Sequence, residues 1–371
     1  MGIYADYAAA APLRPEARAA MLEALDAGLG NASSVHDPGA RARARLEAAR
    51  EEVAAALGAH PLEIVFTSGA TEANNLALAG VARARSASMR IAVAATEHAS
   101  VLATARALAA DGHGITELAT DGQGIVDLDA ATPDLLSVAL VNAETGLVQD
   151  VAALAGRGAL VHTDAAQAGS WLALDVDGLG VDLLTLGSTK VGGPAGAGVL
   201  YVRRGVRLAP LHHGGPHEQG LRAGSENVPA IVGFTTALTL AVTERAAMAA
   251  RVGALRDRLR GALAAVWPDA RPTLAPDTAA APHVLNVILP GVVGEDVVAA
   301  LDLEGVAAST GSACAAGAAE PSHVLLAMGH GASAARGSLR LSFGWNSTDA
   351  DVDGILAALA RVRTRVASEA A

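Results

Sequence analysis

The chain contains 27 lysine and arginine residues, and only one of them is a lysine. That residue, Lys190, lies in LLTLGSTKVGGPAGAGVLYV (183–202), after an apolar strand-like run and before a glycine-rich turn. A guanidinium is always protonated, whereas a lysine amine can lose its proton in an apolar site and then attack a carbonyl carbon. An arginine-rich chain could keep one lysine by chance, but this position between two apolar runs favours a nucleophilic amine.

Two other polar stretches begin where apolar runs end. In FTSGATEANN, the residues Gly69, Ala70 and Thr71 lead into a helix, and the free N–H groups at a helix start attract anions. In ALVHTDAAQ, Asp164 ends an apolar run that we predict to be a strand. Sheets of α/β proteins bind ligands at the carboxyl ends of their strands, which is where Asp164 would lie. Taken alone, each stretch could equally be an ordinary helix cap.

Together these groups match the needs of a single cofactor. Pyridoxal phosphate requires a lysine for a Schiff base, a carboxylate for its pyridine nitrogen and an anion site for its phosphate. Lys190, Asp164 and the turn at 69–71 supply one of each. The sequence therefore predicts a pyridoxal-phosphate enzyme.

The overall composition limits the remaining possibilities. A chain of 371 residues with 51% hydrophobic content can bury a large core. Its formal charge of −11 argues against nucleic acid or an anionic membrane as the main partner. We see no signal peptide and no apolar run long enough to span a membrane. Cys314 is the only cysteine, which excludes an intrachain disulfide, and we expect a cytoplasmic protein.

Apolar strand-like runs alternate with alanine-rich helical stretches, a pattern typical of an α/β protein with a mostly parallel, helix-covered sheet. The predicted strands are 63–68, 90–95, 135–141, 159–164, 182–188 and 198–202. The predicted helices are 45–58, 71–85, 98–112 and a long one near 229–265. We expect a large cofactor-binding domain at 14–245 and a smaller α+β domain at 246–371, with segment 1–13 packed against the smaller domain.

Ten stretches, some of which overlap the segments above, carry a resemblance that runs over nearly the whole chain. They are ADYAAAAPLRPEA, GNASSVHDPGARARARLEAAR, EIVFTSGATEANNLAL, TEHAS, ETGLVQD, HTDAAQ, GPAGAGVLYVRRG, HHGGPHEQGLRAGSENVPAIVG, STGSACAAGAAEPSHVLLAMG and SLRLSFG. In this order and spacing the chain resembles the cysteine desulfurases, pyridoxal-phosphate enzymes of the class V aminotransferase-like group. The resemblance implies fold type I, with a mostly parallel seven-stranded sheet and a smaller α+β domain. It also implies L-cysteine as substrate, a homodimer with shared active sites and a sulfur-accepting partner protein.

The resemblance also assigns cofactor-binding residues. His98 should stack on the pyridine ring and move protons, although a buried structural histidine is the alternative. Gln167 should hydrogen-bond the phenolic oxygen, and Ser188 or Thr189 should contact the phosphate. Ser225 matches the residue that reaches the phosphate of the neighbouring subunit.

On the substrate side, the resemblance gives Arg340 the role of binding the substrate carboxylate with its two-pronged guanidinium, although a rim salt bridge is the alternative. It places Asn142 beside the substrate as well. Cys314 would be the nucleophile whose thiolate takes the sulfur atom, leaving alanine and a persulfide. A free cysteine is more often a buried apolar residue, so this role depends on the resemblance.

Three positions depart from the family pattern. Ala143 replaces a second asparagine, and Gly187 and Thr189 replace a serine and a histidine before the lysine. Each lost contact could weaken binding by about 1–3 kcal/mol. Two alternatives therefore stay open beside a desulfurase: another class V lyase or epimerase, such as a selenocysteine or C–S lyase, or a catalytically weak relative that serves as a sulfur carrier.

Overall fold

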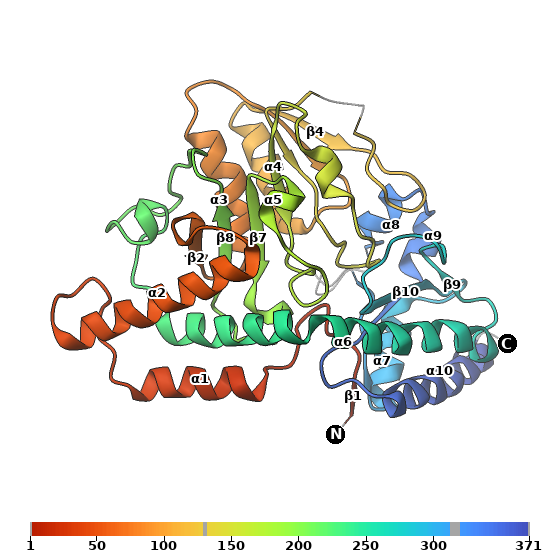
Figure 1. The fold of residues 1–371 in the computed structure, drawn as a ribbon. Helices are drawn as coiled ribbons and strands as arrows, with labels where there is room; N and C mark the ends of the chain where they lie inside the picture. Colours follow the sequence, from red (N-terminus) through yellow and green to blue (C-terminus); the bar gives the residue numbers. More distant parts are fainter. Residues whose placement is uncertain (1, 129–131, 312–319, 370–371) are drawn as a thin grey trace.

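A computed structural model describes residues 2–128, 132–311 and 320–369 of the chain. Its centre is a seven-stranded sheet in the order β2-β8-β7-β6-β5-β3-β4 (Figure 1). The strands are β2 (Ile64–Thr67), β3 (Arg90–Ala94), β4 (Gly114–Leu118), β5 (Leu135–Ser137), β6 (Leu160–Asp164), β7 (Leu183–Gly187) and β8 (Gly198–Val202). Strand β8 runs antiparallel to both of its neighbours, and the other pairings are parallel. The prediction of a mostly parallel seven-stranded sheet is confirmed.

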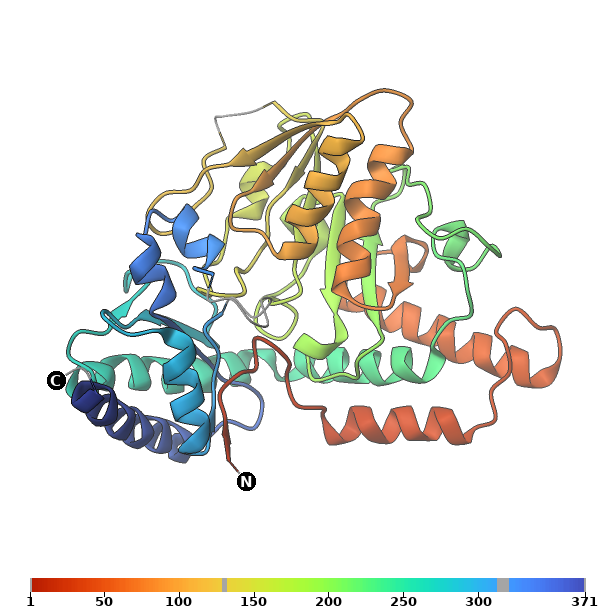
Figure 2. The same ribbon diagram turned by 180° about the vertical axis from the view of Figure 1, so that it is seen from behind.

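Helices cover both faces of this sheet because successive strand residues point to opposite sides. On one side, Val65 and Ile91 pack with helices α3 (Ala70–Arg83) and α4 (Ala99–Ala110). On the other side, Phe66 and Leu184 pack with helices α2 (Asp37–Leu57) and α6 (Val228–Val266). Helix α1 (Pro15–Asp26) lies against α6, and Figure 2 shows this arrangement from behind. Both faces are therefore buried, as a parallel sheet requires.

A second core forms beside the first, around a three-stranded antiparallel sheet in the order β12-β10-β9. Its strands are β9 (Arg271–Pro272), β10 (Val284–Ile288) and β12 (Ser338–Ser342). Helices α7 (Gly294–Leu303) and α10 (Asp349–Glu369) pack into this core, and α8 (His323–Ala327) and α9 (Ala332–Arg336) form a smaller apolar cluster with Ile288 of β10. Strand β1 (Ile3–Tyr4) pairs in parallel with β11 (Val306–Ala307), so the N-terminus joins this region.

The remaining elements are short: helix α5 (Val176–Leu179) and the 3₁₀ helices η1 (Pro61–Glu63), η2 (Val151–Leu154), η3 (Ser188–Lys190) and η4 (Glu218–Gly220). Helix α6 runs beneath both cores in Figure 1 as one continuous element. The proposed boundary at residue 245 falls inside this helix, and the division into two domains stays a prediction. No helix in the described part of the chain has the length and apolar character needed to cross a membrane.

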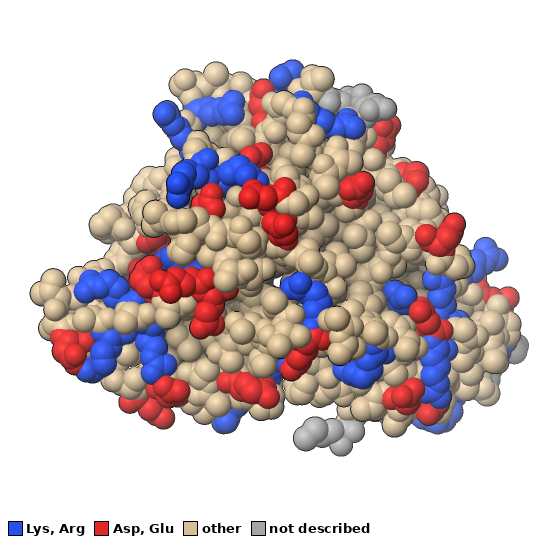
Figure 3. Space-filling model, in the orientation of Figure 1, with Lys and Arg blue, Asp and Glu red and all other residues tan. Residues whose placement is uncertain are grey.

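Acidic and basic side chains are interspersed over the face of the molecule in Figure 3. Many of them form exposed pairs, such as Arg258 with Asp353 and Arg45 with Glu23. Exposed pairs of this kind contribute little to stability, because water screens them.

Candidate active site

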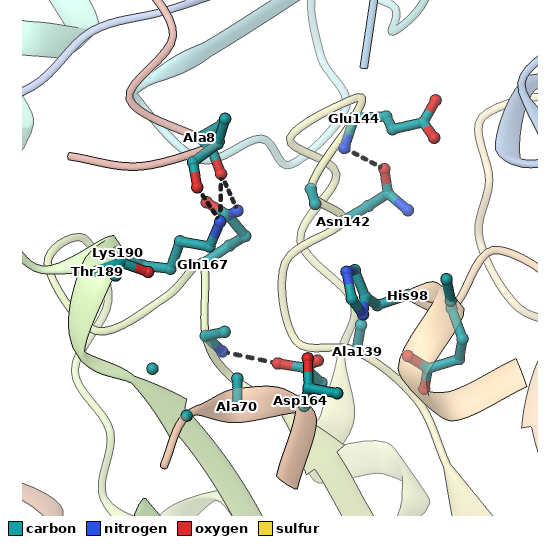
Figure 4. Close-up of a pocket in the computed structure, with 18 of the residues that line it drawn as sticks. Ala8, Ala70, His98, Ala139, Asn142, Glu144, Asp164, Gln167, Thr189 and Lys190 are labelled. Carbon is teal, nitrogen blue, oxygen red and sulfur yellow. Dashed lines mark hydrogen bonds between the residues drawn. The ribbon is translucent and has the colours of Figure 1, made fainter. Parts of the chain in front are cut away.

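A cavity of about 720 Å³ opens where β6 and β7 end, between the two cores (Figure 4). All but two of the residues predicted for the site line it: Ala70, Thr71, His98, Asn142, Asp164, Gln167, Ser188, Thr189, Lys190 and Arg340. The exceptions are Ser225, which is exposed on the loop before α6, and Cys314, which lies outside the described residues. Sequence positions more than 250 residues apart therefore meet in one cavity.

Lys190 reaches the cavity from the short helix η3 that follows β7. Its amine donates hydrogen bonds to the carbonyl oxygens of Ala8, at 2.9 Å, and Ala9 (Figure 4). The turn after it needs glycine, because a Cβ on Gly193 would lie 2.3 Å from the Ser188 hydroxyl. The N-terminal segment thus supplies the acceptors for the only lysine of the chain.

Asp164 forms part of the cavity floor and is fixed by two hydrogen bonds. One carboxylate oxygen accepts the side-chain amide N–H of Asn74 at 2.7 Å, and the other accepts the backbone N–H of Ala166 at 2.9 Å. Asn74 is fully buried on α3 and also donates to Ser100 at 2.9 Å. Sequence reasoning missed Asn74, although it belongs to the TEANN stretch that begins this helix. The carboxylate is therefore held in one orientation.

His98 stands opposite Lys190 at the start of α4. Its Nδ1 accepts the backbone N–H of Ser100 at 3.1 Å, so the neutral ring carries its proton on Nε2. Burial lowers the pKa of His98, and the Lys190 charge acts in the same direction, while Asp164 opposes them. His98 is therefore a neutral imidazole near pH 7, able to give a proton at Nε2.

The start of α3 leaves room for an anion. Gly69 precedes the helix, and no atom lies within 4 Å of the position where its Cβ would be. A Cβ on Gly198 would lie 2.6 Å from the Gly69 backbone, so glycine in β8 lets the turn sit close to the sheet. The first N–H groups of the helix, at Ala70 and Thr71, have no partner within the helix. The Ser188 hydroxyl is buried with no hydrogen-bond partner among the described residues.

The orientation of the Gln167 side chain depends on His283, which the sequence analysis did not predict. Its amide nitrogen donates to the Ala8 carbonyl at 2.7 Å, and its oxygen lies 3.3 Å from Nε2 of His283. The His283 ring stacks on Trp171, with 4.6 Å between centroids, and burial lowers its pKa to about 3. A neutral His283 can donate a hydrogen bond from Nε2, and only the oxygen of the Gln167 amide can accept it. The amide nitrogen must then point toward the Ala8 carbonyl.

Arg340 and Asn142 both line the cavity and contact the same turn. Arg340 donates from Nη2 to Asp6 at 2.8 Å and from Nη1 to the Ala143 carbonyl at 3.0 Å. The Asn142 oxygen accepts the backbone N–H groups of Glu144 and Thr145, at 3.0 and 2.9 Å. Asn142 therefore holds the turn that carries Ala143, and its contact with a substrate stays a prediction.

Two buried carboxyl groups beside the cavity were not predicted. Glu97 accepts the Ser137 hydroxyl at 2.9 Å, and burial, assisted by the Asp164 charge, raises its pKa to about 8. Glu144 accepts the Ser322 hydroxyl, and burial raises its pKa as well. Glu97 lies within the TEHAS stretch next to His98, which was the only sequence signal for it.

Known proteins similar to this chain cover almost all of it. The family model for class V aminotransferases matches residues 3–355. The sequence is 39% identical over 383 residues to cysteine desulfurase IscS 1 of Archaeoglobus fulgidus, covering 98% of each chain. It is 40% identical over 387 residues to an IscS-like cysteine desulfurase of Mycobacterium tuberculosis, covering 99% of this chain and 98% of the relative.

Solved structures are similar as well. A NifS-like protein superposes with a TM-score of 0.91 at 32% identity, over 98% of this chain and 100% of that one. SspA, solved in complex with cysteine, superposes with a TM-score of 0.78 at 32% identity, over 92% of this chain and 98% of its own.

Proposed function

We propose that this chain, which belongs to the class V aminotransferase family, is a cysteine desulfurase that uses pyridoxal phosphate. In this reaction L-cysteine becomes L-alanine, and its sulfur atom moves to the thiol of Cys314 as a persulfide. One observation carries the proposal: the Lys190 amine, the Asp164 carboxylate and the start of α3 line one cavity, together with Arg340.

The residues of the cavity fit the cofactor. Asp164, held by Asn74 and Ala166, would keep the pyridine nitrogen protonated. The open space above Gly69 and the buried hydroxyl of Ser188 suit a phosphate group. When bound, pyridoxal phosphate supplies an electron sink for negative charge on the substrate.

The chain's own groups would then divide the remaining tasks. Lys190 binds the cofactor through its amine and can take a proton once that amine is free. His98 presents Nε2 to the cavity and can exchange a proton there. Arg340 binds the substrate carboxylate and so orients the amino acid.

Sulfur transfer requires a thiolate, and Cys314 is the only thiol of the chain. Its sulfur would attack the sulfur of L-cysteine, so that an S–S bond forms while the bond between the substrate's Cβ and sulfur breaks. The electron pair of the broken bond stays with the carbon fragment, which takes up protons to become L-alanine. Cys314 lies outside the described residues, so this role depends on the family and on its being the only cysteine.

We further propose a homodimer, in which the exposed Ser225 contacts the phosphate of the partner's cofactor. The persulfide sulfur would pass to an acceptor protein that assembles iron–sulfur clusters or thiolates another molecule. Since relatives carry the name IscS, iron–sulfur assembly is the better supported of these two routes. A single free cysteine suits a reducing, cytoplasmic setting.

A product assay with L-cysteine tests the reaction. Wild-type protein should release L-alanine, and mass spectrometry should find one added sulfur atom on the peptide that contains Cys314. The Cys314→Ser protein should still bind L-cysteine, because Lys190 and Arg340 are unchanged, but it should release no sulfide under reductant. Alanine formed by Cys314→Ser, with no persulfide on the wild type, would instead identify a different class V lyase.

A further inference from the structure

The guanidinium of Arg340 has a carboxylate partner within the chain. Its Nη2 donates to Oδ1 of Asp6 at 2.8 Å, and its Nη1 donates to the Ala143 carbonyl at 3.0 Å. The Arg340 side chain is 4% exposed, whereas that of Asp6 is 20% exposed. Both terminal nitrogens of the proposed carboxylate-binding group are therefore engaged by the chain itself, and Nη2 by a carboxylate, while Nε has no hydrogen-bond partner among the described residues.

The backbone on both sides of Asp6 is tied to the strand that carries Arg340. Ala5 accepts the backbone N–H of Ser342 at 2.8 Å, and the N–H of Ala8 donates to the Ser342 hydroxyl at 2.9 Å. Ser342 lies two residues after Arg340 on β12. These backbone contacts hold Asp6 beside Arg340. Because the Asp6 side chain is partly exposed and that of Arg340 is buried, Asp6 is the member of the pair that can turn toward solvent.

Two other carboxyl groups that line the cavity are engaged elsewhere. Glu144 accepts the hydroxyl of Ser322, and Asp164 accepts hydrogen bonds from Asn74 and Ala166. Among the described residues, Asp6 is therefore the one whose carboxylate forms an ion pair with Arg340.

We propose that Asp6 sets the substrate affinity of this enzyme because its carboxylate binds Arg340 at the position that the substrate's α-carboxylate takes. The proposal rests on the proposed function, in which Arg340 binds that α-carboxylate. Two carboxylates that compete for Nη2 repel each other, so Asp6 must leave when an amino acid binds. Each ligand with a carboxylate therefore spends part of its binding free energy on separating this pair, while a ligand without one does not.

The test uses the holoenzyme and the change Asp6→Asn, which removes the charge and keeps the size. Binding of L-alanine, measured by the change in cofactor absorbance, should become about tenfold tighter, or about 1.4 kcal/mol. Cysteamine has the amine and thiol of cysteine but no carboxylate, so its affinity should be equal in both proteins. A matched control is Asp26→Asn, at the exposed end of α1, which should change neither affinity.

Equal or weaker L-alanine binding by Asp6→Asn would overturn the proposal, as would an equal gain for cysteamine. If the variant does not fold, a crystal structure of the wild-type holoenzyme with L-alanine decides the matter. The α-carboxylate should then lie at Nη2 of Arg340, with the Asp6 carboxylate turned away, and an Asp6 that keeps its bond to Nη2 refutes the idea. A selective gain for L-alanine in a protein that makes no alanine from L-cysteine would support the role of Asp6 and reject the desulfurase reaction.

Discussion

Replacing Glu97 with glutamine tests the buried carboxyl beside His98. The Glu97 side chain has no exposed surface, and burial raises its pKa to about 8, with the Asp164 charge adding to the effect. Near neutral pH the folded protein therefore keeps a proton on Glu97 that the unfolded chain has lost. Glutamine has almost the same shape and never ionises, so Glu97→Gln should remove this proton linkage and leave the hydrogen bond to Ser137 possible.

The sign and size follow from the two pKa values. Glutamate in the unfolded chain titrates near 4.5, so from there to about pH 8 the folded state binds one proton more. The free energy of unfolding then falls as pH rises, by at most about 1.4 kcal/mol per pH unit. His162, whose pKa is lowered to about 4 by burial, has the opposite effect, but only below its unfolded value of 6.5. Between pH 6.5 and 8 the effect of Glu97 exceeds that of His162 and lowers the free energy of unfolding by about 1.6 kcal/mol.

Urea unfolding of the holoenzyme at pH 6.5 and at pH 8 measures this difference. Wild-type protein should lose about 1–2 kcal/mol more than Glu97→Gln between the two pH values. Glu16→Gln, an exposed change on α1, is the matched control and should behave like wild type. Identical pH dependence in wild type and Glu97→Gln would show that Glu97 is ionised in the folded protein, and the reasoning from burial would be wrong.

Three further predictions concern the cavity. Lys190→Ala should abolish covalent attachment of the cofactor after borohydride reduction, because Lys190 is the only lysine; a fixed cofactor in that variant, detected by peptide mass spectrometry, would contradict its role. Asp164→Asn should retain some bound cofactor but lose most alanine production, since the pyridine nitrogen loses its anionic partner; unchanged turnover in the alanine assay would exclude this role. Ala143→Asn, which restores the family residue, should raise L-cysteine turnover several-fold, equivalent to about 1 kcal/mol. Lower turnover with that variant would indicate a site shaped for another substrate.

The strands of the central sheet could be predicted because most of them are short, largely buried runs rich in Val, Leu and Ile. Strand β4 was missed, since four of its five residues are at least partly exposed and it lies at the sheet edge. Helix α2 begins at Asp37, earlier than the predicted residue 45, because the ring of His36 caps it by accepting the N–H of Gly39. The sequence analysis missed this start because Pro38 and Gly39 follow it, and both residue types usually indicate a loop.

The cavity itself could be predicted only in part. Lys190 and Asp164 are recognisable because each follows a predicted strand, where α/β sheets bind ligands. Their partners come from distant positions: Ala8 is 182 residues from Lys190, and Asp6 is 334 residues from Arg340. No local pattern encodes such contacts, so the roles of Asp6 and of the Ala8 carbonyl emerge only from the folded chain.

The N-terminal segment around Ala8 also bears on the order in which the molecule is made. A ribosome delivers residues 3–8 long before it delivers their partners on β11 and β12. Until then the segment has no strand to pair with, even though β6 and β7 can already associate. The carbonyl groups that accept hydrogen bonds from Lys190 and the carboxylate that pairs with Arg340 therefore take their places only after β12 has been made. The candidate active site is therefore completed later than the central sheet, whose strands all precede residue 203.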